Sequence, residues 1–257
     1  TGWVRQKLGR VSDERVSWDA ERLLVEIEEK AEVFRKRSDD ELRAGAVQWR
    51  REALADRMQD SLSLVDAFAG LREASRRVLG LHHYPEQILA GLILVNGGVA
   101  EQATGEGKTL TITLPAFWFG LTGKGVHVVT VNEYLASRDC EFVTPLFEFF
   151  GLSVGLLETD LEPEKKIEVY RRDIVYGTGY DFGFDYLRDQ LKIVDETENR
   201  PVARLYRVLS GESIREKSTM HRRLHHAIVD EIDSVLIDAA ASPLLISQQK
   251  VGGRRTP

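Results

Sequence analysis

The sequence predicts an α/β fold in which a parallel sheet is flanked by helices and preceded by an N-terminal helical segment. Residues 14–80 show helical periodicity, with apolar side chains recurring at three and four positions. Beyond residue 85, short apolar runs alternate with helical stretches, a pattern typical of βαβ units. We therefore predict a helical segment over 1–80, an α/β domain over 81–247 and a tail over 248–257.

The N-terminal segment contains three helix-like stretches. One of them carries a clear apolar face, made of Leu23, Leu24, Ile27, Ala31 and Phe34. Residues 38–41 have the composition of a helix start. The first eleven residues form a basic amphipathic pattern that could suit an anionic membrane surface, but we favour a solvated, frayed end.

Five apolar runs are the candidate strands: 126–131, 153–157, 173–176, 227–229 and 244–246. They are too continuous for half-exposed strands, so we expect helices on both faces of the sheet. Ligands should then bind at the carboxyl ends of the strands. Residues 192–222, rich in Arg, Glu and Ser, are predicted to be a surface excursion containing one helix.

Composition narrows the function classes. The net charge of -6 argues against a protein that wraps nucleic acid, so we expect no nucleic-acid partner. No run reaches the roughly 18 apolar residues of a membrane-spanning helix, and no secretion signal is evident, so we expect a cytoplasmic protein. Cys140 is the only cysteine, which excludes an internal disulfide. The chain starts at Thr1 and stops soon after an apolar run, which suits a fragment, with a complete truncated gene product as the alternative.

The strongest motif is Ala-Thr-Gly-Glu-Gly-Lys-Thr at 103–109. The short run 99–101 precedes it and a helix-forming stretch follows at 110–121, which supplies the strand, loop and helix that a phosphate cradle needs. Gly105 and Gly107 would let backbone N–H groups approach a phosphate chain, and the helix N-terminus favours an anion. The motif therefore predicts binding of ATP with Mg²⁺.

Each side chain of this loop has an expected role. Lys108 would bridge the β and γ phosphates, and the Thr109 hydroxyl would bind Mg²⁺. Thr104 and Glu106 would shape the loop, the latter without a catalytic role. Because Gln102 stands where the strict motif has glycine, the loop follows the variant found in helicase-like motors.

A second motif is Ile-Val-Asp-Glu at 228–231, an apolar strand that ends in two acids. Asp230 would hold Mg²⁺ through water, and Glu231 would polarise the attacking water. The alternative is a strand that leaves the core into a charged loop. Because the carboxyl ends of parallel strands share one edge, Lys108 and Asp230 should reach the same triphosphate.

Several segments resemble the SecA family of protein-translocation motor ATPases: 126–139, 145–149, 174–178, 182–189 and 226–238, with 38–42 and 72–80 upstream. The resemblance covers about residues 20–247. It implies a RecA-like fold in a motor that drives unfolded preproteins through a SecY-type channel from the cytoplasmic side of the inner membrane. It is also compatible with an oligomer.

The resemblance also implies residue roles. Gln87 becomes the adenine-binding glutamine, and 130–139, 177–178 and Arg188 couple nucleotide state to movement. Two departures stand out. The chain has His-His-Tyr-Pro-Glu-Gln at 82–87 where the family has Arg-His-Phe-Asp-Val-Gln. It has Asp-Ala-Ala-Ala-Ser-Pro at 238–243 where the family has Asp-Glu-Ala-Arg-Thr-Pro, which removes a carboxylate and a guanidinium.

By the same resemblance, the second motor domain with its arginine finger would lie beyond Pro257. Such a finger contributes roughly 10³ to 10⁵ in turnover, so we expect the isolated chain to bind ATP and hydrolyse it slowly. Two alternatives stay open. One is a superfamily 2 nucleic-acid helicase domain, which needs a basic or aromatic groove. The other is a nucleotide-binding module that has lost catalysis, in keeping with the alanines at 239–241.

Overall fold

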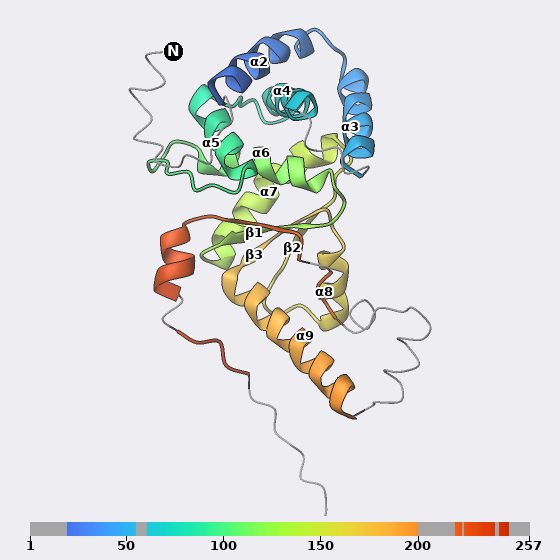
Figure 1. Cartoon of the computed structure of the whole chain (residues 1–257), viewed down its shortest axis with the longest axis vertical. Coiled ribbons are helices and arrows are strands. Elements are labelled where there is room, and N and C mark those ends of the chain that lie inside the picture. The colour runs from blue at the N-terminus through green and yellow to red at the C-terminus, as the bar shows by residue number, and fades with distance from the viewer. Residues whose placement is uncertain (1–19, 55–60, 200–218, 223, 240–241, 247–257) are drawn as a thin grey trace, which may run out of the picture.

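The computed structural model describes residues 20–54, 61–199, 219–222, 224–239 and 242–246. The proposed membrane-binding pattern at 1–11, the tail at 248–257 and the middle of the predicted excursion lie outside these residues. Within them, three N-terminal helices precede a four-stranded parallel sheet with helices on both faces (Figure 1). This confirms the predicted fold class.

The N-terminal helices are α2 (Ala20–Phe34), α3 (Asp39–Leu54) and α4 (Ser61–Val78). All five residues of the predicted apolar face of α2 are buried. The start of α3 is fixed by a capping box, in which the Glu41 N–H donates to Ser38 Oγ at 3.3 Å. The Ser38 N–H donates in return to the Glu41 carboxylate at 2.7 Å.

Trp49 joins the helical segment to the rest of the molecule. Its ring packs against Phe34 of α2, and against Phe117 and Phe150 of the α/β part, with ring centroids 6.2, 6.3 and 6.3 Å away. Side chains from both parts belong to one continuous hydrophobic core. The three helices are therefore held against the sheet-bearing part by apolar burial.

The sheet consists of β1 (Val126–Thr130), β2 (Val154–Leu156), β3 (Ile174–Thr178) and β4 (His226–Val229). All pairings are parallel, and the strand order is β2-β3-β1-β4. The helices of this part are α5 (Pro85–Val95), α6 (Lys108–Gly120), α7 (Glu133–Phe149), α8 (Pro163–Tyr170) and α9 (Gly179–Asn199).

The two faces of the sheet bury alternate residues of the same strands. Val128 of β1 and Tyr176 of β3 join the core that contains α6 and α7. Val129 and Val175 face the opposite way, toward a smaller core with Tyr170 of α8 and Phe182 of α9. Helices cover both faces, as the continuous apolar runs predict.

Two predicted strands are wrong. Residues 99–101 and 244–246 are irregular, and Val99 and Leu245 are 70% and 79% exposed. Neither run pairs with a strand of the described sheet, so a short run of this composition did not specify a strand. The part of the chain that the structure describes holds no helix both long and apolar enough to cross a membrane.

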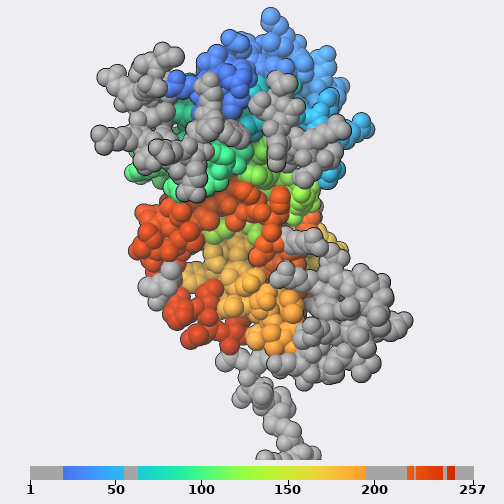
Figure 2. Space-filling view, in the orientation of Figure 1, coloured from blue at the N-terminus to red at the C-terminus, as the bar shows by residue number. Residues whose placement is uncertain are grey.

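The predicted excursion 192–222 starts on the exposed part of α9 and ends inside the fold. Its first residues continue α9, and at its far end Met220 and His221 are buried. The Asp189 carboxylate accepts hydrogen bonds from the N–H groups of both, at 2.7 and 2.9 Å. Arg222 donates to the carbonyls of Tyr170 and Gly123 at 2.8 and 3.1 Å. These contacts anchor the chain just before β4, which lies near the middle of the face shown in Figure 2.

Candidate functional site

The predicted phosphate loop is an exposed turn that leads directly into α6. Gly105 and Gly107 have φ angles of 86° and 77°, a left-handed conformation that glycine adopts without strain. A Cβ atom on Gly107 would lie 2.4 Å from Gln87 Nε2, so the end of the Gln87 side chain would have to move. The backbone conformation therefore favours glycine at 107, and a side chain there would displace the Gln87 amide.

Four donors of this loop are free. Among the described residues, no acceptor pairs with the backbone N–H groups of Gly105, Gly107, Lys108 or Thr109. They surround the N-terminus of α6, whose positive end favours an anion. The Lys108 ammonium likewise forms no hydrogen bond or ion pair within the described chain, although the side chain is half-buried.

The Gln87 side chain holds the loop through hydrogen bonds to the backbone. Its Oε1 accepts from the Tyr84 N–H at 2.9 Å, and its Nε2 donates to the carbonyl of Glu106 at 2.8 Å. The Glu106 carboxylate accepts from the Ala103 N–H at 3.0 Å, which closes the turn. The Gln87 side chain is 5% exposed and both ends of its amide are engaged. Its predicted contact with adenine is therefore an additional role that stays a prediction.

His83 is a residue of this region to which the sequence had assigned no role. It is buried, with Nε2 at 3.0 Å from the Leu110 carbonyl and 2.9 Å from Thr113 Oγ1. Burial lowers the pKa of His83 to about 3, so the ring is neutral. It holds the first turns of α6, and hence the loop before them. In the sequence, only its place in the 82–87 segment could have drawn attention to it.

The acidic pair follows β4. The Asp230 N–H donates to the Val129 carbonyl at 2.9 Å, and Asp230 Oδ1 accepts from the Glu231 N–H at 2.9 Å. Burial raises the pKa of Asp230, and the nearby charge of Lys108 opposes that rise. Lys108 begins α6 without a preceding strand, contrary to expectation, yet its charge lies close enough to act on this carboxyl.

Glu231 has an unusual backbone. Its φ angle is 52°. Among the described residues, no other non-glycine residue has a positive φ. This conformation costs roughly 1 kcal/mol or more in a side-chain-bearing residue. The side chain is exposed and its carboxylate has no partner among the described residues. It is therefore free to contact a molecule bound beside it.

The predicted coupling residues are held in ion pairs. Arg138 contacts the buried Asp139 at 2.7 Å, and Arg188 contacts the buried Asp185 at 2.8 Å. The negative charge of Asp139 contributes to the raised pKa of Asp230, which places the Arg138–Asp139 pair beside the acidic motif. The Arg188 pair belongs instead to the α8–α9 face, where Lys166 contacts the same carboxylate at 3.2 Å.

This arrangement fits a triphosphate with a divalent ion. Free N–H groups and a free ammonium suit phosphate oxygens, and the charge of Lys108 acts on the Asp230 carboxyl. No group of three His, Cys, Asp or Glu side chains in the described ranges could hold a metal alone. Thr109 and Asp230 would therefore need phosphate oxygens or water to complete a coordination shell, which is how Mg²⁺ is usually held beside nucleotides.

Comparison with known proteins identifies close relatives. A family model described as the SecA DEAD-like domain matches residues 5–255. The protein translocase subunit SecA of Clostridium botulinum (strain Eklund 17B / Type B) is 45% identical over 227 residues, covering 88% of this chain and 24% of the relative. The same subunit from C. botulinum (strain Alaska E43 / Type E3) has the same identity and coverage. The chain thus spans about a quarter of the length of these relatives.

Proposed function

The chain belongs to the SecA family, and on this premise we propose that it is the ATP-binding motor domain of a SecA-like preprotein translocase. The observation that carries the proposal is the open phosphate loop, with its unpaired N–H groups and free Lys108, within electrostatic reach of Asp230. Family membership alone does not specify which residues act, and this geometry supports the residues proposed below.

The residues divide into two roles. The N–H groups of Gly105 and Gly107, with Thr104 and Glu106 shaping the turn, would hold the phosphate chain, and Lys108 would neutralise its charge. Thr109 and Asp230 would hold the metal ion, by the hydroxyl directly and by the carboxylate through water. Bound Mg²⁺ would supply charge neutralisation at the phosphate oxygens.

Glu231 is the residue that would orient and polarise the attacking water. Its carboxylate is unpaired, exposed and adjacent to the proposed metal ligand. The strained φ angle fits that role, because strain that persists in a fold is often concentrated at functional positions. The backbone bond from the Glu231 N–H to Asp230 fixes the two acids relative to each other.

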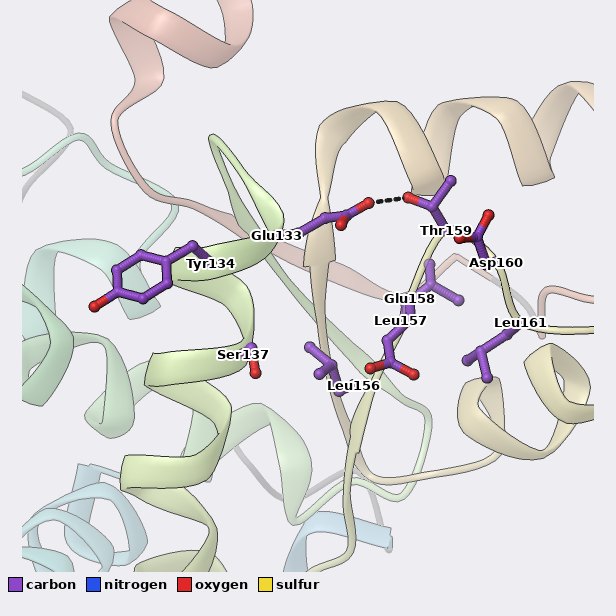
Figure 3. Close-up of a pocket in the computed structure, with 9 residues that line it drawn as sticks. All are labelled: Glu133, Tyr134, Ser137, Leu156, Leu157, Glu158, Thr159, Asp160 and Leu161. Atoms are coloured by element: carbon purple, nitrogen blue, oxygen red, sulfur yellow. Dashed lines mark hydrogen bonds between the residues drawn. The ribbon is translucent and has the colours of Figure 1, made fainter.

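The wider function follows the family. We propose that the complete protein couples ATP hydrolysis to the export of unfolded preproteins through a SecY-type channel, at the cytoplasmic side of the inner membrane. Without the arginine finger expected on a second motor domain, hydrolysis by this chain should be slow. The helicase alternative needs a basic groove, and the acid-lined hollow at the carboxyl end of β2 and the first turn of α7 (Figure 3) does not provide one.

ATP turnover under single-turnover conditions tests the proposal. We expect slow but measurable hydrolysis by the parent chain, little by Glu231→Gln despite retained binding, and none by Lys108→Ala. The exposed Glu148→Gln on α7 is the matched control and should behave as the parent. Equal turnover in all four proteins would reject the proposed active site. Binding without turnover in the parent would instead support the catalytically incomplete module.

A further inference from the structure

Glu106 places a carboxylate inside the phosphate loop. The residue is exposed and lies between Gly105 and Gly107, the two glycines whose backbones are left-handed. Its side chain bends back toward the start of the loop, because the carboxylate accepts a hydrogen bond from the Ala103 N–H at 3.0 Å. In the proposed nucleotide site Glu106 only shapes the turn, which leaves the effect of its charge on a ligand open to analysis.

The backbone around Glu106 is also held in place. Its N–H donates to the Ala103 carbonyl at 3.3 Å, and its carbonyl accepts from Gln87 Nε2 at 2.8 Å. Gln87 is buried, so this second bond ties the loop to the packed part of the molecule. The negative charge of Glu106 is therefore held in the loop, next to the N–H groups of Gly105 and Gly107 that would bind the phosphate chain.

An acid in this position opposes the binding of an anion. Of the residues proposed to act at the site, Lys108 is the cation, whereas Glu106, Asp230 and Glu231 are acids. The two acids after β4 would face the metal ion and the attacking water, but Glu106 belongs to the loop that would face the phosphates. The Coulomb repulsion between its carboxylate and a ligand grows in proportion to the negative charge of that ligand.

A bound metal ion changes this charge. Metal-free ATP carries about four negative charges at slightly alkaline pH, and its complex with Mg²⁺ carries about two. The same carboxylate should therefore oppose binding of the metal-free nucleotide with about twice the free energy. We propose that Glu106 determines specificity at the proposed ATP site, on which this inference rests: its carboxylate repels metal-free ATP more strongly than the Mg²⁺ complex.

Nucleotide titrations of Glu106→Gln in the full chain test this role. Glutamine removes the charge but keeps an oxygen that can accept from the Ala103 N–H, so the loop should keep its shape. Calorimetric titrations at low ionic strength compare ATP in EDTA with ATP in excess MgCl₂. We expect the substitution to tighten binding of metal-free ATP about tenfold and binding of Mg·ATP about threefold, in the ratio set by their charges.

Two further measurements show whether the charge is responsible. Glu106→Asp keeps a carboxylate in the loop and should bind both ligands as the parent does. In about 0.5 M NaCl, where exposed charges are screened, the higher affinities of Glu106→Gln should fall to within about twofold of the parent. The matched control is Glu148→Gln, which removes an exposed acid at the C-terminal end of α7 and should change neither affinity.

The possible results distinguish this role from the ATP site itself. Equal tightening for the two ligands, or no tightening in Glu106→Gln, would overturn the role of Glu106 in specificity. If Lys108→Ala still weakens binding of Mg·ATP in the same experiments, the proposed ATP site stands without that role. No binding of Mg·ATP by the parent would contradict both proposals.

Discussion

The side-chain amide of Gln87 donates a hydrogen bond to the backbone carbonyl of Glu106 at 2.8 Å, and so ties the start of α5 to the phosphate loop. Family resemblance assigned this glutamine to adenine. In the structure, the Gln87 amide contacts the backbone of the loop, and it also lies 3.4 Å from the Gly107 carbonyl. A residue in that position would shape the site for the phosphates of any nucleotide.

Replacing Gln87 separates these two roles. If its main effect is on the loop, Gln87→Ala should weaken binding of Mg·ATP and of inorganic tripolyphosphate by the same factor, about tenfold for a lost buried hydrogen bond. Competition against a fluorescent ATP analogue measures both. Gln48→Ala, on the surface of α3, is the control. A loss of affinity for ATP alone, with tripolyphosphate binding unchanged, would indicate that Gln87 contacts the adenine base instead.

The left-handed backbone of Glu231 predicts a conflict between stability and activity. Glycine adopts a φ of 52° without strain, so Glu231→Gly should raise the free energy of unfolding by about 0.5–1 kcal/mol and abolish ATP hydrolysis. Urea denaturation followed by circular dichroism measures the first effect. Glu231→Ala, which lacks the carboxylate but keeps a Cβ atom, should lose activity without gaining stability. A lower free energy of unfolding in Glu231→Gly would contradict the claim that the backbone of Glu231 is strained.

His127 makes stability depend on pH. Burial, with the charges of His221 and Arg222, lowers its pKa from 6.5 to about 4, and its ring stacks on Phe182 at 4.6 Å. The unfolded chain takes up a proton below about pH 6.5, whereas the folded chain does not until about pH 4. The contribution of His127 is therefore complete above pH 6.5 and declines as the pH falls, by about 2 kcal/mol at pH 5.

The variant His127→Phe isolates this effect, because phenylalanine keeps the aromatic packing and cannot titrate. Its free energy of unfolding should fall by about 2 kcal/mol less than that of the parent between pH 7.5 and pH 5. Urea titrations at the two pH values provide the comparison. Identical losses in the two proteins would mean that His127 is accessible to protons in the folded state.

Asp189 is expected to be among the most sensitive positions for stability. Burial alone would raise its pKa, but hydrogen bonds from His221 and from two backbone N–H groups lower it overall. Asp189→Asn presents an amide N–H to one of these donors and should cost about 2–3 kcal/mol in the free energy of unfolding. The exposed Asp160→Asn should cost almost nothing. Similar losses of unfolding free energy in both variants would show that the hydrogen bonds of Asp189 to the chain before β4 do not stabilise the fold.

Local patterns predicted much of this molecule. The spacing of Leu23 to Phe34 specified the buried face of α2, and the continuous runs at β1 and β3 predicted helices on both faces of the sheet. These predictions succeeded because periodicity reports burial directly. The glycine-rich loop likewise predicted a helix N-terminus with open N–H groups.

Long-range contacts could not be predicted. The runs at Val99 and Leu245 have strand-like composition but no neighbouring strand, and pairing is a property of the whole sheet. The bond between Asp189 and His221 joins residues 32 positions apart, and His221 ends a stretch, 192–222, whose charge had suggested solvent exposure. The contact of Gln87 with the loop depends on how α5 packs, which no local pattern records.

The most direct test of the central claim is a calorimetric titration of Mg·ATP into the parent chain, Lys108→Ala and Lys124→Ala at pH 7.5. Lys124 is an exposed lysine just beyond the far end of α6 and serves as the matched control. We predict one binding site in the parent and in Lys124→Ala, and affinity about 10- to 100-fold lower in Lys108→Ala, as expected for a lost charged contact to phosphate. Equal affinity in all three proteins would contradict the assignment of the 103–109 loop as the phosphate site.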